Sequence, residues 1–135
     1  MRKFLAIAAA LIAAGAINAA EGLPPNCQKT VFSEEESGYM AGYNCFYPAQ
    51  TILGAYQIVK RDLIALPGSD DFQKLRDKLE VGENYEDAFG DYLIEYAWQT
   101  KDVLQVTIAY EAGDTTLLFA QQKTGALADV EFYIQ

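Results

Sequence analysis

The residues of this chain that could carry acid–base chemistry are its adjacent carboxylates. They stand at Glu34-Glu35-Glu36, Asp70-Asp71 and Glu86-Asp87. A glycoside hydrolase needs two carboxyl groups that face each other across a cleft, and neighbours in sequence do not supply that geometry. We interpret the glutamates as a solvated turn and the other two pairs as charges at helix starts. A carboxylate-dependent glycan hydrolase is kept as an alternative hypothesis.

Histidine is absent from the chain, and there are two cysteines. Without imidazole there is no Ser-His or Cys-His nucleophile, and most transition-metal sites are excluded. Cys27 and Cys45 are predicted to form one disulfide in an oxidising compartment, which leaves no free thiol. A glycine-rich phosphate loop is also missing. These features predict a protein that is not an enzyme and that holds no cofactor and no metal.

The first twenty residues are expected to be a signal peptide and not part of the fold. Arg2 and Lys3 precede an apolar, alanine-rich run, and small residues follow it at a cleavage point after Ala19 or Ala20. The run is short for a membrane span, which needs about 20 apolar residues. We therefore predict a periplasmic or secreted protein without a stable membrane anchor, in which residues 21–135 form a single domain.

The chain is acidic, with a formal net charge of −9. Without Arg2 and Lys3 the charge is −11, from eight Lys plus Arg against nineteen Asp plus Glu. Such a surface repels phosphate backbones and anionic lipid head groups, so nucleic-acid binding is not expected. A basic protein partner is compatible with it.

Tyrosines are numerous and cluster near the acidic run. Tyr39, Tyr43 and Tyr47 follow one another at intervals of four residues, shortly after Glu34, Glu35 and Glu36. Tyrosine is enriched at protein–protein contacts because it has an apolar body and a polar tip. These six residues are the predicted binding site, and the alternative is that the tyrosine rings fill the core.

The C-terminal third alternates apolar and polar residues with a period of two. This predicts four strands at 91–99, 103–111, 115–122 and 126–134, which form an antiparallel meander with one apolar face. Before it, residues 29–33 and 39–47 are predicted to form a hairpin that brings Cys45 back towards Cys27.

Helices are expected between the hairpin and the meander, as a cover for its apolar face. Pro48 is placed to start an amphipathic helix that runs to about Leu66, although 56–66 could instead fold as a hairpin. A second helix follows Ser69 and ends near Gly82, and a third helical turn spans 85–89. The predicted fold class is therefore α+β, with two or three short helices packed on one face of a four-stranded meander and a disulfide-tied N-terminal segment.

Several short runs resemble a known group of periplasmic proteins. They are Tyr96-Ala97-Trp98, Val106-Thr107-Ile108, Ala120-Gln121-Gln122 and Asn84–Gly90. Over about residues 70–127 the chain resembles the helix-plus-meander proteins of the SmpA/OmlA and β-lactamase-inhibitor-like type. This resemblance implies an α+β fold and a function in binding proteins.

Together these features predict a small exported protein-binding module. An inhibitor, an immunity protein against a toxin, and an accessory of envelope assembly are the roles considered. Besides the glycan hydrolase, a carrier with a small apolar ligand between helix and sheet is the other alternative.

Overall fold

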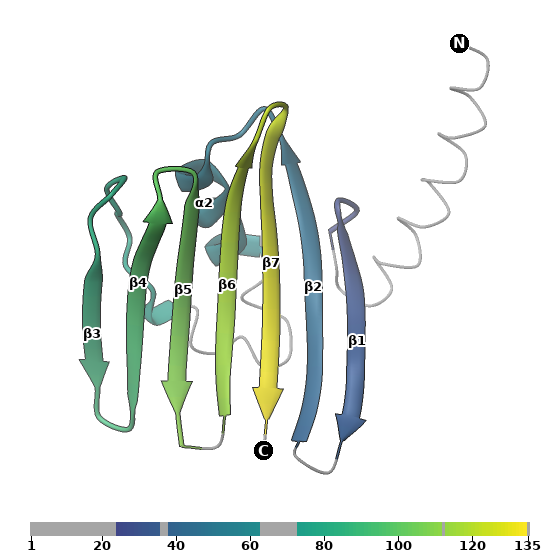
Figure 1. The fold of residues 1–135 in the computed structure, drawn as a ribbon, viewed down its shortest axis with the longest axis vertical. Helices are drawn as coiled ribbons and strands as arrows, with labels where there is room; N and C mark the ends of the chain where they lie inside the picture. The colour runs from purple at the N-terminus through teal and green to yellow at the C-terminus, as the bar shows by residue number, and fades with distance from the viewer. Residues whose placement is uncertain (1–23, 36–37, 63–72, 112, 135) are drawn as a thin grey trace, which may run out of the picture.

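The structure, a computed structural model, describes residues 24–35, 38–62, 73–111 and 113–134. Within these ranges the chain forms one antiparallel sheet of seven strands, in the order β1-β2-β7-β6-β5-β4-β3 (Figure 1). Its elements are β1 (Cys27–Glu35), β2 (Gly38–Pro48), α2 (Ile52–Asp62), β3 (Tyr85–Phe89), β4 (Tyr92–Thr100), β5 (Val103–Tyr110), β6 (Gly113–Gln122) and β7 (Gly125–Ile134). The predicted signal peptide, 1–20, lies outside the described residues.

The four C-terminal strands β4 to β7 confirm the predicted meander. Alternate side chains point to one face, so that Tyr96 lies opposite Val106 on the next strand, followed by Leu117 and Val130. All four are at most 1% exposed. Each large apolar side chain buried in this way contributes about 1.5–3 kcal/mol to stability, which explains why the period-two pattern predicts these strands well.

The N-terminal hairpin is also confirmed, and it extends the same sheet. Cys27 of β1 lies directly opposite Cys45 of β2, and the two form a disulfide. β2 then pairs along its length with β7, from Tyr39 opposite Ile134 to Pro48 opposite Gly125. The first strands of the chain are therefore joined to its last strand, and the sheet has β1 at one edge and β3 at the other.

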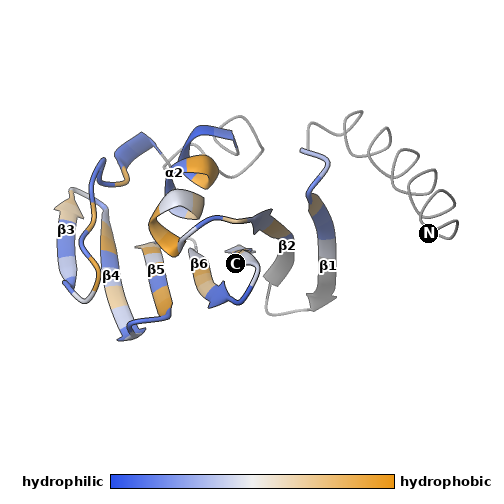
Figure 2. Ribbon diagram, turned by 90° about the horizontal axis from the view of Figure 1, so that it is seen from above, coloured by the Kyte–Doolittle hydropathy of each residue, from blue (hydrophilic) through white to orange (hydrophobic). Residues whose placement is uncertain are grey.

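Helix α2 lies against one face of the sheet (Figure 2). Thr51 caps its start, because the amide of Gly54 donates to Thr51 Oγ1 at 3.1 Å. The buried residues of the helix, which face β6 and β7, are Ile52, Ala55, Tyr56 and Val59. The sequence left 56–66 as helix or hairpin, and the structure shows helix as far as Asp62; residues 63–66 lie outside the described part.

The segment after α2 is held on the same face through Arg76. Its amide donates to Tyr96 Oη at 2.8 Å, and its carbonyl accepts from Tyr56 Oη at 2.6 Å. Its guanidinium donates to both carboxylate oxygens of Asp87, each at 2.8 Å, and lies 4.1 Å from the centre of the Tyr85 ring. This network ties the helix, the following segment and strands β3 and β4 together.

The predicted fold class is wrong. The structure is mostly one seven-stranded sheet with a single helix in its described part, not two or three helices on a four-stranded meander. Residues 85–89, predicted as a helical turn, form strand β3, because Gly90 with φ of 56° lets the chain reverse and pair Phe89 with Tyr92. Between 73 and 79, where a second helix was expected, only residues 73–74 are helical. Among the described residues no helix is long and apolar enough to cross a membrane.

Candidate functional site

Two predicted contact residues, Tyr43 and Tyr47, are buried on the helix side of the sheet. They are 7% and 4% exposed, so they do not form the surface expected of them. Tyr43 packs edge-on against Phe132, with ring centres 5.8 Å apart. Burial, followed by the nearby carboxylate of Asp62, raises the pKa of the Tyr47 hydroxyl to about 12. The alternative that these rings fill the core is the one the structure supports.

The remaining predicted contact residues are only partly described. Glu34 pairs with Tyr39 along the backbone of β1 and β2, and Glu35 ends β1. The side chains of these three residues lie outside the described part, as does Glu36.

The face of the sheet opposite α2, called the open face below, carries a row of polar residues in register. The row is Glu86, Glu95, Thr107, Thr116 and Glu131, on β3, β4, β5, β6 and β7 respectively. Neighbouring strands lie about 4.8 Å apart, so the row crosses about 19 Å of sheet. Asp129 lies two residues from Glu131 and on the same face. Glu86, Glu95, Asp129 and Glu131 are named here the acidic face, and Asp114 lies on the same side of the sheet.

These carboxylates include two neighbouring pairs, Glu86 with Glu95 and Asp129 with Glu131. Glu86 is directly opposite Glu95 in the β3–β4 pair, and both are exposed. Like charges in this position destabilise a sheet. Burial, followed by the nearby Asp129 carboxylate, raises the pKa of Glu131. The open face therefore carries two pairs of neighbouring negative charges, Glu86 with Glu95 and Asp129 with Glu131.

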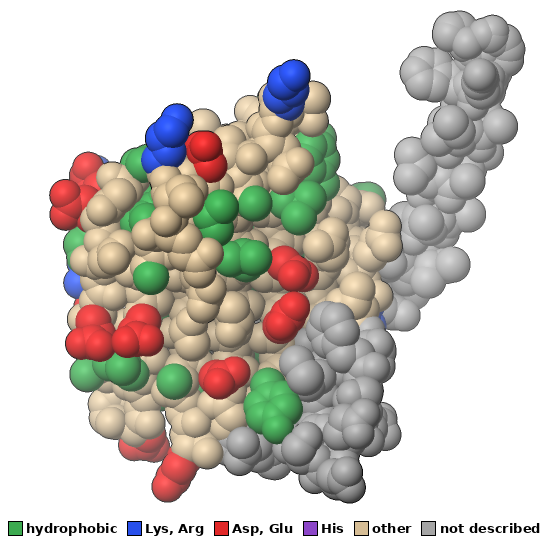
Figure 3. Space-filling model, in the orientation of Figure 1, with side chains coloured by type: hydrophobic (Ala, Val, Ile, Leu, Met, Phe, Trp, Pro, Cys, Tyr) green, Lys and Arg blue, Asp and Glu red, His purple; other side chains and the backbone are tan. Residues whose placement is uncertain are grey.

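No described lysine or arginine compensates these charges on the open face. The cations lie in α2 and the segment after it, in the turns at 101 and 123, or on β1, where Lys29 pairs with Tyr43 and so points to the other side. Figure 3 shows the open face, with carboxylates spread over it and cationic side chains only at its margins.

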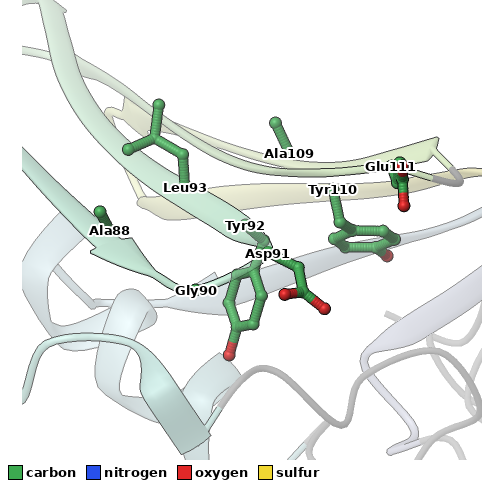
Figure 4. Close-up of a pocket in the computed structure, with 8 residues that line it drawn as sticks. All are labelled: Ala88, Gly90, Asp91, Tyr92, Leu93, Ala109, Tyr110 and Glu111. Atoms are coloured by element: carbon green, nitrogen blue, oxygen red, sulfur yellow. The ribbon is translucent and has the colours of Figure 1, made fainter.

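Two shallow hollows lie at or next to the Glu86–Glu95 pair. The larger, of about 680 Å³, has a floor of small or aliphatic side chains from Ala88, Leu93 and Ala109, with Asp91 and Glu111 near its rim (Figure 4). The smaller, of about 430 Å³, includes both glutamates of the pair. Both are open to solvent and can admit side chains of a partner.

A short apolar strip lies on the same open face, four residues along β7 from Glu131. Ala120 of β6, Leu127 of β7 and Phe46 of β2 are in register, and all three are partly exposed. A surface that combines charge with apolar area suits a protein partner better than a free metal ion. The structure thus brings together residues that the sequence analysis did not select.

A signal for the acidic face was present in the sequence. Glu95 alternates with buried Ile94 and Tyr96, and Asp129 and Glu131 alternate with Val130 and Phe132. This alternation marks them as outward-facing residues of strands. Glu86 was missed because residues 85–89 were predicted to be helical.

Comparisons with known proteins add little to this description. The chain is an antiparallel-sheet protein with one described helix, and no family model and no curated protein matches it. CalU16 from Micromonospora echinospora, a solved structure, is similar over 80% of this chain and 70% of its own, at 11% identity and a TM-score of 0.36. A similarity at that level carries no argument about function, and the resemblance to SmpA/OmlA-type proteins stays a prediction.

Proposed function

We propose that this chain is a small exported protein-binding module that docks a basic protein on the acidic face. The observation that carries the proposal is the Glu86–Glu95 pair on a sheet face without described cations. Two carboxylates held opposite each other cost stability in the free protein. Lysine or arginine side chains of a partner would remove that repulsion, so the arrangement favours a cationic partner.

The compartment supports the same proposal. The Cys27–Cys45 disulfide is compatible with an oxidising, exported compartment. We propose a periplasmic or secreted location, where an inhibitor, an immunity protein or an assembly accessory would meet its partner. The proposal keeps an acidic surface as the binding site, but on other residues than the predicted Glu34, Glu35 and Glu36, and it does not include the tyrosines.

The test compares two variants that lose the same charge. Glu86→Gln/Glu95→Gln neutralises the pair, and Glu80→Gln/Glu83→Gln neutralises two exposed glutamates in the segment after α2. Proteins captured from a cell-envelope extract at about 10 mM salt, where the Debye length is about 30 Å, are identified by mass spectrometry. Their affinity is then measured with purified components.

The expected result is one basic protein that binds the wild type and the control variant with equal affinity. The Glu86→Gln/Glu95→Gln variant should bind it roughly tenfold more weakly, as loss of two charge contacts implies, and salt should weaken all three complexes. Equal affinity for both variants, or no discrete partner at low salt, would contradict the proposal.

A further inference from the structure

Strand β3 forms one edge of the sheet, so only one of its two long sides is paired (Figure 1). All of its residues, Tyr85–Phe89, lie opposite residues of β4 without a register shift. Apart from this pairing, the backbone of β3 forms no hydrogen bond with a described residue. An edge strand in this state is a template on which another strand can pair.

The backbone groups of Glu86 and Ala88 point outward from this edge. Because the loop between β3 and β4 has two residues, the hairpin closes on a hydrogen-bonded pair. Bonded and non-bonded pairs alternate from there, so Glu86 and Ala88 each present an amide and a carbonyl to the outer side. The Trp98 amide agrees with this direction, because it points to the β3 side and donates to Asn84 Oδ1 at 2.9 Å.

The opposite edge of the sheet, β1, is protected in ways that β3 is not. The pairing of β1 with β2 shifts register between Val31 and Ser33, and β1 also carries Lys29. Bulges and lysines keep edge strands from pairing with other chains. β3 is regular and contains neither lysine nor proline. Its two charged residues, Glu86 and Asp87, are both negative, so this edge repels an acidic strand and attracts a basic one.

The open face favours a basic side chain on an added strand. A residue placed opposite Glu86 would extend the row that contains Glu86 and Glu95, with its Cβ about 5 Å from that of Glu86. The hollow of about 430 Å³ lies beside this position, and its lining includes both glutamates and Ala97. A lysine or arginine there would meet two carboxylates that form no ion pair with a described residue.

The helix side of the same edge disfavours a basic side chain. Asp87 is already paired with Arg76, and Lys74 Nζ lies 5.7 Å from the ring centre of Phe89. A cation on this side would approach two others, whereas an apolar side chain would meet the rings of Tyr85 and Phe89. The two sides together therefore select a segment in which basic and apolar residues alternate.

We propose that β3 binds an extended segment of the partner as an additional antiparallel strand, with lysine or arginine at alternate positions on the open face. The inference rests on the proposed function for the class of partner, and it adds the β3 backbone as a second element of recognition. Antiparallel pairing continues the pattern of the whole sheet. The β3 strand of a second copy does not meet the requirement, because it has no basic residue and brings more negative charge.

Two end-blocked peptides of equal composition test the alternation. TKVKVKT carries lysine at every second position, and TVKKKVT carries the same lysines together. The full protein is titrated with each at about 10 mM salt and followed by NMR. The alternating peptide should bind roughly tenfold more tightly and should shift the amide resonances of Glu86 and Ala88. Equal affinity for the two peptides would overturn the proposal.

N-methylation of the alternating peptide tests whether its backbone pairs with β3. In an antiparallel strand the residue opposite Glu86 turns its amide towards β3, so the lysine amides bond and the valine amides point away. Methylation of the lysine amides should weaken binding roughly tenfold or more, while methylation of the valine amides should leave it nearly unchanged. The proposal does not survive if the two methylated peptides bind alike.

Ala88→Pro closes the edge from the side of the protein. Proline removes an outward-pointing amide and leaves the bonds between β3 and β4 in place. The matched control is Ala88→Val, which keeps the amide. Only the proline variant should lose affinity for the alternating peptide, and a proline variant that binds like the control would contradict the pairing. Should Ala88→Pro not fold, the methylated peptides test the same pairing on the unaltered protein.

The outcomes separate this inference from the proposed function. If Ala88→Pro binds the basic partner like the wild type while Glu86→Gln/Glu95→Gln binds it weakly, the strand pairing is overturned and the acidic face stands. Failure to capture any basic partner would contradict the proposed function, whereas the peptides test the edge without it. A dimer of the protein alone in sedimentation, dispersed by Ala88→Pro, would assign the edge to a second copy and overturn the proposal.

Discussion

Glu86 and Glu95 lie directly opposite each other on the antiparallel strands β3 and β4, on a face of the sheet with no described lysine or arginine. Neighbouring strands place such side chains about 5 Å apart at their Cβ atoms. The two charges are exposed, so water and salt screen them, but nothing in the described protein neutralises them. This relationship is the basis of the proposed function, and it has a consequence for stability.

Neutralising one member of the pair should stabilise the protein. Glu95→Gln is expected to raise the free energy of unfolding by about 0.2–1 kcal/mol at neutral pH and low salt, because a repulsive cross-strand pair is removed. Chemical denaturation of both proteins measures the difference, which should shrink at high salt. Glu80→Gln, at an exposed position outside the strands, is the control and should change little. A loss of stability in Glu95→Gln would mean that the two glutamates do not repel each other.

Glu131 should make stability depend on pH. Its pKa is raised above the ordinary value of 4.5, chiefly by burial and then by Asp129. The folded state therefore holds a proton that the unfolded state releases, so stability should increase as the pH falls through the raised pKa towards 4.5. In Glu131→Gln this part of the pH dependence should vanish, and the variant should be more stable than the wild type at pH 7. Unfolding curves for both proteins across this range test it, and parallel pH profiles would contradict it.

Removing the Tyr56 hydroxyl should destabilise the protein through Arg76. In Tyr56→Phe the ring still packs against Phe119, whose centre is 6.0 Å away, but the Arg76 carbonyl loses its donor. The expected cost is about 1 kcal/mol. Tyr85→Phe is the control, because no hydrogen bond to its hydroxyl is seen among the described residues and the contact between the ring and Arg76 remains. Thermal or chemical denaturation that finds equal stability for the two variants would show that this hydrogen bond contributes nothing.

The disulfide should account for a sizeable share of stability. Cys27 and Cys45 are separated by 18 positions, and a closed loop of that size is worth about 3 kcal/mol in the chain-entropy model. Cys27→Ala/Cys45→Ala should lose about this much in denaturation experiments. Both residues are 0% exposed, so a reductant should act on the native protein slowly and on the unfolded protein quickly. Rapid reduction without denaturant would show that the hairpin opens readily.

Local patterns in the sequence predicted much of the sheet but not the class of fold. The strands with Ile94 and Tyr96, or Val130 and Phe132, were predictable because alternation reports directly on a half-buried strand. The segment 85–89 was not, because five residues contain too little periodicity to distinguish a strand from a turn of helix. Its alternation of Tyr85, Asp87 and Phe89 is read correctly only when β4 is present as a partner.

The burial of two of the predicted contact residues, Tyr43 and Tyr47, has a related reason. Tyr43 and Tyr47 follow an acidic run, which favours an exposed surface when the segment is considered alone. In the folded chain β2 lies between β1 and β7, so its inward side chains meet Phe132 and the core. Which side of a strand is covered depends on where the helix packs, and a single segment does not contain that information.

The sequence by itself determined the alternating strands, the cysteine pair and the excess of negative charge, because each depends on residue types or on neighbours a few positions apart. Only the tertiary structure decided that β2 pairs with β7, that α2 covers one face, and that Glu86 meets Glu95 on the other. These outcomes depend on contacts between segments far apart in the chain, or on the choice of one pairing partner among several. They are selected by burial of the whole apolar face and not by local preference.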